Sequence, residues 1–156
     1  MDAAAAVSAM RELLADTVTR LQSAGVRDEA LAEWKPVRRL LPSQPTMLPS
    51  SRAWRLGSLL LDAEGRLYAT GIVTRAIQPK DFNADKSVAA EARRDLQRAA
   101  VRGRFATGDS VNVDYIPVQL EALEFDGENL VFHDNATTAP LATYITDRLE
   151  LVLHPF

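Results

Sequence analysis

The sequence predicts one α+β domain over residues 1–156, with a mainly antiparallel sheet, an N-terminal helix and a central basic helix. Three observations lead to this fold class. An amphipathic helical period occupies the N-terminus, a second helical segment lies near the middle, and the strand-like runs do not alternate regularly with helices as βαβ units do. Hydrophobic residues make up 47% of the 156 residues, which is enough for a packed core.

Residues 3–24 have the spacing of an amphipathic helix, and Gly25 is placed to terminate it. The apolar side of this helix can pack on the sheet of its own chain or on a partner chain. We favour packing within the chain, because the stripe is short for a coiled coil and Thr17 interrupts a heptad seam. The stripe consists of Val7, Met10, Leu14, Val18 and Leu21.

Composition divides the predicted domain into three segments. Residues 1–34 form a helical N-terminal segment, in which Asp28 caps a second short helix that runs to Trp34. Residues 35–50 contain four prolines and form a connector, either a loop or an extended wrap. Residues 51–156 form the α+β core.

Residues 52–61 and 66–76 are predicted to form a β-hairpin. The segment 62–65 separates two apolar runs, and a three-residue loop with Gly65 in the left-handed conformation is a common connection between such strands. This turn fixes the register of the two strands. The expected pairs are Leu61 with Leu67, Leu59 with Ala69, and Gly57 with Gly71.

The central helix is expected to begin at Asp85 or Ser87, to run to about Arg102 and to end at Gly103. Beyond it, residues 110–124 are predicted to form one or two strands interrupted at Pro117.

The C-terminal part is predicted to contain two further strands and a short helix. A turn at residues 126–129 leads into a strand that ends at His133. Thr138 and Pro140 are expected to begin a helix over residues 141–148. The last predicted element is an apolar strand over residues 149–153.

Composition excludes several classes of site. The chain contains no cysteine, so a disulfide framework, a thiolate metal site and a cysteine nucleophile are all excluded, and a cytoplasmic location is expected. No apolar run approaches the roughly 20 residues that span a bilayer. No membrane association is therefore expected, and the N-terminal residues lack the basic start of a signal peptide. No cofactor is predicted.

The net charge of −3 makes nucleic-acid binding unlikely, but the charges are unevenly distributed along the chain. Residues 1–104 hold 17 basic and 12 acidic side chains, whereas residues 105–156 hold one basic and nine acidic side chains. Such a distribution indicates either complementary faces within one fold or a dipolar surface.

Three arginines of the central helix, Arg94, Arg98 and Arg102, recur every four residues and so form one basic stripe. A functional interpretation is contact with an anion or a partner. The alternative, which we favour, is a solvated face in which Glu91 pairs with Arg94 and Asp95 pairs with Arg98.

Arg52 and Trp54 are a second candidate pair, able to line a pocket for an acidic ligand. Strand alternation places these two side chains on one face and Arg55 on the other. The alternative is that both residues have purely structural roles.

The two histidines, His133 and His154, are the only imidazoles in the chain. Together with Asp114 and Asp134 they could form a metal site or an acid–base pair. No ligand spacing supports this, so we expect two histidines with no shared site, and no metal is predicted.

Several known catalytic motifs are missing from the sequence. It contains no GxSxG nucleophile elbow, no Gly-rich phosphate loop, no HExxH and no Ser-x-x-Lys. The common nucleophilic and metal-dependent hydrolase classes are thereby disfavoured.

Four segments carry a resemblance: 51–57 (SRAWRLG), 67–71 (LYATG), 93–96 (RRDL) and 151–155 (LVLHP). They resemble a family of small uncharacterised bacterial proteins, some of whose members are automatically labelled glutaminase. The resemblance extends from about residue 51 to the C-terminus, and the N-terminal helix is similar only in kind. It brings no established catalytic residues, so it assigns none in this chain.

Two hypotheses about function follow. The favoured one is a non-catalytic binding or protein-interaction domain, with self-association into a homo-oligomer left open. The alternative is a small hydrolase acting on an amide substrate, which the resemblance implies and the motifs do not support.

Overall fold

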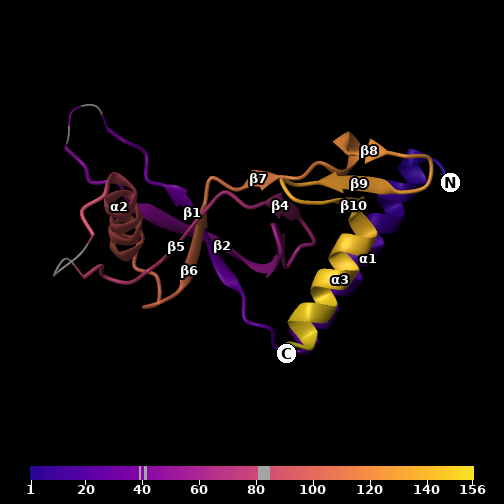
Figure 1. The fold of residues 1–156 in the computed structure, drawn as a ribbon, viewed down its shortest axis with the longest axis horizontal. Coiled ribbons are helices and arrows are strands. Elements are labelled where there is room, and N and C mark those ends of the chain that lie inside the picture. The colour runs from indigo at the N-terminus through magenta and orange to yellow at the C-terminus, as the bar shows by residue number, and fades with distance from the viewer. Residues whose placement is uncertain (39, 41, 81–84) are drawn as a thin grey trace. The chain divides into compact units, whose positions relative to one another are not determined.

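The computed structural model describes residues 1–38, 40, 42–80 and 85–156, and it has the predicted α+β class (Figure 1). The described chain divides into two compact units, each assembled from separate stretches of sequence. The first unit comprises Met1–Asp28, Ala53–Ala69 and Ile116–Phe156, and the second comprises Glu29–Arg52 and Thr70–Tyr115. These units do not follow the predicted segments 1–34, 35–50 and 51–156.

Helix α1 (Ala3–Ser23) opens the first unit and matches the predicted helix. The Asp2 side chain caps its start by accepting from the Ala5 amide. At its end Gly25 has a φ of 63°, and the amides of Gly25 and Val26 donate to Gln22 and Leu21, which is a Schellman cap.

The apolar stripe of α1 is buried within the chain, as favoured. Met10, Leu14, Val18 and Leu21 are buried in the core of the first unit, and Val7 packs against that core. Thr17 is also fully buried, and its hydroxyl donates to the Leu13 carbonyl 2.7 Å away. The residue that argued against a heptad seam is therefore part of the core.

Three antiparallel pairings build the sheet of the first unit. The end of β2 (Met47–Leu56) pairs with β3 (Leu59–Asp62), which pairs with β4 (Leu67–Ala69). Strand β4 pairs in turn with β7 (Ile116–Pro117). The observed register places Leu61 opposite Leu67 and Leu59 opposite Ala69, the two pairs that the turn predicts.

The predicted hairpin over residues 52–76 is wrong in its extent. Residues 53–56 fold back on β3 through a turn at Gly57, so Gly57 is not paired with Gly71. Strand β5 (Ile72–Arg75) pairs with β6 (Ser110–Val113) instead. Gly57 adopts a left-handed φ of 66°, which suits a tight turn between two antiparallel strands.

A smaller sheet of three strands completes the β-structure of the first unit, in the order β10 (Thr138–Pro140), β9 (Leu130–His133) and β8 (Glu124–Phe125). A 3-10 turn, η1 (Leu120–Ala122), precedes it. The predicted turn at 126–129 is present, with the Asp126 carboxylate accepting from the Glu128 and Asn129 amides.

The predicted C-terminal strand over residues 149–153 is wrong, because helix α3 (Leu141–Leu153) includes these residues. Residues 149–153 continue the helix, because the apolar residues from Leu141 onward follow a period of three and four. Leu149 is buried whereas Leu151 is 44% exposed, although a strand would place both on one face. Helix α3 lies beside α1, the yellow and indigo helices of Figure 1.

In the second unit, β1 (Glu29–Trp34) pairs in parallel with β6. Strand β1 corrects the predicted short helix that was to begin at Asp28. Its residues Ala30, Leu31 and Ala32 are all buried, and this burial in a sheet outweighs their helical propensity. The Pro-rich connector also ends earlier than predicted, since β2 begins at Met47.

Helix α2 (Val88–Arg102) has the predicted limits. Ser87 caps its start by accepting from the Ala90 amide 3.1 Å away. Gly103 follows its end with an ordinary φ of −79°, and a Cβ there would lie 1.8 Å from the Met47 carbonyl oxygen. Close approach to β2, rather than left-handed backbone, is what requires glycine at this position.

The break between strands that was expected at Pro117 lies at a different residue. Pro117 is part of β7, and the chain turns at Asp114, which has a positive φ of 57°. No helix in the described part of the chain is long and apolar enough to cross a membrane.

Candidate functional site

The basic stripe of α2 is largely neutralised by acidic side chains of the same helix. Arg94 donates to Glu91 at 2.8 Å, and Arg98 donates to Asp95 at 2.9 Å and to Glu91 at 3.1 Å. The Glu91–Arg94 and Asp95–Arg98 pairs are the i, i+3 pairs of the favoured alternative. They lower the pKa of Glu91, with the hydrogen bonds from Arg94 and then Arg98 as the largest causes.

Arg102, the third member of the stripe, has a different environment. Its Nε donates to the Pro45 carbonyl oxygen 2.8 Å away, and no carboxylate among the described residues pairs with it. Of the three arginines in the stripe, Arg102 is therefore the candidate for contact with an anion.

Arg52 and Trp54 each have a partner within the protein. Arg52 makes a bidentate pair with Asp109, with N–O distances of 2.9 and 3.1 Å. Trp54 is buried in the core of the first unit, where its indole nitrogen donates to the Val26 carbonyl. These contacts are of the kind that the structural alternative describes, and the pocket for an acidic ligand stays a prediction.

The two histidines have separate partners. His133 contacts Glu124 and Thr138 across the three-stranded sheet, at 2.8 and 3.0 Å. His154 lies 3.7 Å from Glu150 on α3. Among the described residues, no group of three or more acidic or imidazole side chains is placed to hold a metal ion.

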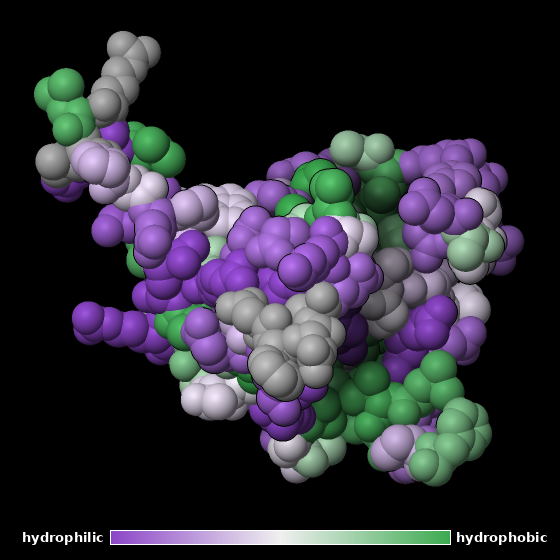
Figure 2. Space-filling model, turned by 60° about the vertical axis from the view of Figure 1, so that its left-hand side comes forward, coloured by the Kyte–Doolittle hydropathy of each residue, from purple (hydrophilic) through white to green (hydrophobic). Residues whose placement is uncertain are grey.

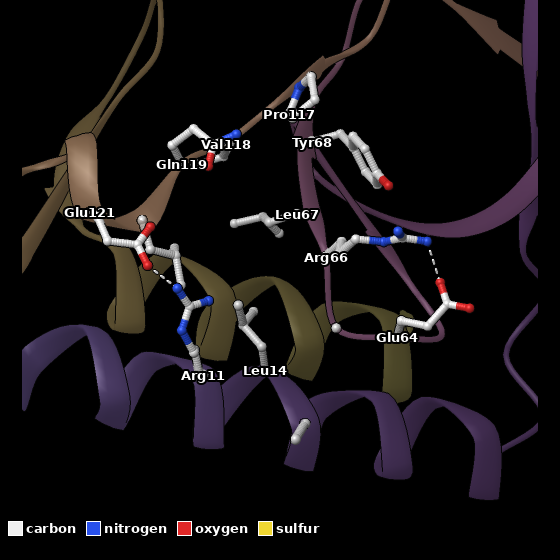
Figure 3. Close-up of a pocket in the computed structure, with 13 residues that line it drawn as sticks. Arg11, Leu14, Glu64, Arg66, Leu67, Tyr68, Pro117, Val118, Gln119 and Glu121 are labelled. Atoms are coloured by element: carbon white, nitrogen blue, oxygen red, sulfur yellow. Dashed lines mark hydrogen bonds and ion pairs between the residues drawn. The ribbon is translucent and has the colours of Figure 1, made fainter.

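A pocket of about 460 Å³ lies within the first unit, between α1, the β3–β4 turn and the segment from β7 to η1 (Figure 3). In Figure 3, Leu14 rises from α1 toward Leu67 of β4, and both are buried side chains of the core. Besides these two leucines, the pocket is lined by Arg11, Ala15, Glu64, Gly65, Arg66, Tyr68, Pro117, Val118, Gln119, Leu120 and Glu121. The volume lies within the range of small-ligand sites.

Leu14 and Leu67 form the apolar floor of the pocket, and two ion pairs border it. Arg11 pairs with Glu121 on one side, and Arg66 pairs with Glu64 on the other. All four side chains are more than half exposed, so these pairs contribute little to stability. They place hydrogen-bond donors and acceptors together at the rim of an apolar pocket.

Asp62 organises the second of these borders from inside the protein. Although only 1% exposed, it accepts four hydrogen bonds, from the Glu64 and Arg66 amides, the Arg66 guanidinium and the Tyr68 hydroxyl. The hydrogen bond with Asp62 is the largest cause that raises the pKa of Arg66. The orientations of Arg66 and Tyr68 are thus fixed by a buried carboxylate.

A hydroxyl cluster in the same unit is the arrangement closest to a hydrolase site. The Ser58 hydroxyl donates to Asp134 at 2.9 Å and lies 3.1 Å from the Tyr144 hydroxyl. Tyr144 also accepts from the Ser58 amide. Because the Ser58 hydroxyl gives its proton to Asp134, Tyr144 is the donor between the two hydroxyls.

This cluster is poorly suited to activating a nucleophile. Hydrogen bonds, first from the Ala136 amide and next from the Ser58 hydroxyl, lower the pKa of Asp134, which makes its carboxylate a weak base. Gly57 precedes the serine, and a Cβ there would lie 2.3 Å from the Tyr144 oxygen, so the turn is tightly packed. The contacts indicate a structural clamp between the β2–β3 turn and α3.

Sequence reasoning missed the pocket of the first unit. Its lining comes from three stretches far apart along the chain. Leu14 and Leu67 were each assigned to a predicted element, but nothing in the sequence indicated that they lie together. Asp62 and Gly65 were recognised as turn residues, but the hydrogen bonds of Asp62 to Arg66 and Tyr68 depend on the β3–β4 pairing.

Comparison with known proteins gave no relative: neither a family model, nor a curated protein, nor a solved structure matches this chain. The function is therefore inferred from the geometry above.

Proposed function

We propose that this protein is a non-catalytic binding domain whose pocket in the first unit receives a peptide segment of a partner protein. The observation that carries the proposal is a leucine floor bordered by two ion pairs. Above the buried Leu14 and Leu67, the half-buried Val118 offers apolar surface to a ligand side chain.

The charges at the rim favour an uncharged polar ligand. Arg11 is balanced by Glu121, so a ligand carboxylate attracted to one is repelled by the other. A peptide group carries one donor and one acceptor, which match the guanidinium and carboxylate groups of the rim. An apolar side chain flanked by peptide amides fits both the floor and the rim.

In Figure 2, hydrophilic side chains cover much of the described surface that faces the viewer, and a group of hydrophobic ones is visible at the lower right.

Selection from a displayed library of random peptides tests this function. We expect the wild-type protein to enrich peptides with an aliphatic or aromatic residue between uncharged neighbours. Ala15→Trp fills the pocket from an exposed position of α1 and should abolish enrichment, whereas Ser8→Trp, an equal change elsewhere on α1, should not. No enrichment, or enrichment that Ala15→Trp leaves intact, contradicts the proposal.

The amide-hydrolase hypothesis is the alternative, and the Ser58 cluster is the observation that bears on it. Membership of the family of small uncharacterised bacterial proteins also stays a proposal, because the comparisons neither support nor oppose it. An assay of glutamine hydrolysis, described in the Discussion, separates the two functions.

Two other expectations from the sequence also stay predictions. Cytoplasmic location is supported by the absence of cysteine. Self-association, if it occurs, uses a surface other than the α1 stripe, because that stripe is buried within the chain. Sedimentation velocity of the purified protein tests the oligomeric state.

A further inference from the structure

A second pocket, of about 510 Å³, lies entirely within the second unit and is separate from the peptide site proposed above. We call it the Trp34 pocket. It is lined by Trp34, Pro45, Ala92, Asp95, Leu96, Ala99 and Arg102.

Trp34, at the end of β1, supplies an aromatic surface in a fixed orientation. Its indole nitrogen donates to the Asp114 carboxylate 3.2 Å away, and the residue as a whole is 37% exposed. Asp114 sits at the chain turn with a φ of 57°, a conformation that aspartate tolerates better than most residues. The turn that ends β6 therefore also anchors the indole.

One face of α2 forms another wall. Ala92, Leu96 and Ala99 recur at spacings of four and three, so they lie on the same side of the helix. Two of the three are alanines, whose small side chains leave space beside the helix. An indole surface and a wall of small apolar side chains suit a planar ring, since aromatic rings stack favourably on indole.

Charge determines which kind of ring fits. Asp95 is paired with Arg98 at 2.9 Å, so it adds no uncompensated charge to the pocket. Arg102 is held by Pro45 through Nε, and its two terminal nitrogens have no partner among the described residues. The pocket thus presents one guanidinium group with donors available to an anion.

We propose that the Trp34 pocket binds a small planar aromatic anion, whose ring stacks on Trp34 and whose acid group pairs with Arg102. A neutral aromatic compound lacks the ion pair, and an aliphatic acid lacks the stacking. Both should therefore bind more weakly than an aromatic acid of the same size.

NMR titration with 2-naphthoate tests this proposal, because the two tryptophan side chains report on different units. Trp54 is buried in the core and serves as an internal reference, and Trp34→Phe assigns the two indole N–H signals. We expect 2-naphthoate to shift the Trp34 signal in a saturable manner and to leave the Trp54 signal unchanged. Affinity should fall at least about tenfold with 2-naphthamide and with cyclohexanecarboxylate.

A pair of charge variants on α2 separates a specific ion pair from general attraction. Arg102→Gln should reduce the affinity for 2-naphthoate to that for 2-naphthamide. Arg93→Gln removes the same charge from an exposed position outside the pocket and should have little effect. The proposal is overturned if the Trp34 signal does not shift, if Trp54 shifts equally, if acid and amide bind alike, or if both variants weaken binding equally.

Discussion

The backbone amide of Ser58 donates to the hydroxyl of Tyr144, 2.9 Å away, and so joins the β2–β3 turn to the first turn of α3. The residue before this serine, Gly57, lies so close to Tyr144 that no side chain fits there. Arg148 covers the Tyr144 ring from the next turn of the helix, 5.1 Å from its centroid. The turn and the helix are therefore positioned together, and the serine is held by contacts that stabilise the fold.

Substitution of two turn glycines tests this packing. Both Gly57 and Gly65 have positive φ values, of 66° and 81°, but a Cβ at Gly65 would meet no atom within 4 Å. Gly65→Ala should lower the free energy of unfolding by about 1–2 kcal/mol, the penalty of the left-handed backbone alone. Gly57→Ala should cost more, because its Cβ also displaces Tyr144. Urea denaturation measures both, and equal losses would show that the turn is not packed against α3.

Two leucines of α3 distinguish the observed helix from the C-terminal strand that the sequence predicts. Leu149 is 3% exposed and Leu151 is 44% exposed. Leu149→Ala should lower the free energy of unfolding by about 2–5 kcal/mol. Leu151→Ala should change it by no more than about 0.5 kcal/mol. Comparable losses for the two variants would contradict the helical register.

Asp134 gives the stability a dependence on pH. Its pKa is lowered in the folded protein, first by the Ala136 amide and then by the Ser58 hydroxyl. Its contribution is therefore complete above the unfolded pKa of about 3.9 and is lost as the pH falls through the folded pKa. The free energy of unfolding should decrease more steeply below about pH 4 in the wild type than in Asp134→Asn. Parallel curves for the two proteins would show that Asp134 titrates alike in both states.

Glutamine should not be hydrolysed at an enzymatic rate. Amide hydrolysis needs an activated nucleophile and donors for the oxyanion, and Ser58 is instead hydrogen-bonded to a carboxylate whose pKa is lowered. Ammonia release should equal the background in the wild type, in Ser58→Ala and in the double variant His133→Ala/His154→Ala. Turnover of about 1 per second or more, lost in one of these variants, would establish the amide-hydrolase alternative.

Local signals in the sequence predicted several elements of the fold well. The α1 stripe, the cap at Ser87–Ala90 and the register set by Gly65 depend on residues close together in the chain. Strand β1 was missed because Ala30, Leu31 and Ala32 favour a helix and become a strand only beside β6. The C-terminal strand was predicted wrongly because alternating leucines at 149, 151 and 153 also fit the last turns of a helix.

The candidate sites were less predictable than the fold. The i, i+3 pairs of α2 were expected from spacing, but the separate environment of Arg102 depends on Pro45, 57 residues away. Trp34 was assigned to a helix, so its contact with Asp114 across 80 residues had no signal in the sequence. Both pockets are formed by segments that only the tertiary fold brings together.

The most direct test of the proposed function is a map of amide chemical shifts during titration with a peptide selected on the wild-type protein. The proposal predicts that the largest changes occur in the segments 11–15, 64–68 and 117–121, which contain the lining of the pocket in the first unit, and that Ala15→Trp abolishes them. Changes centred elsewhere, or changes that persist in Ala15→Trp, would show that this pocket is not where the protein binds its partner.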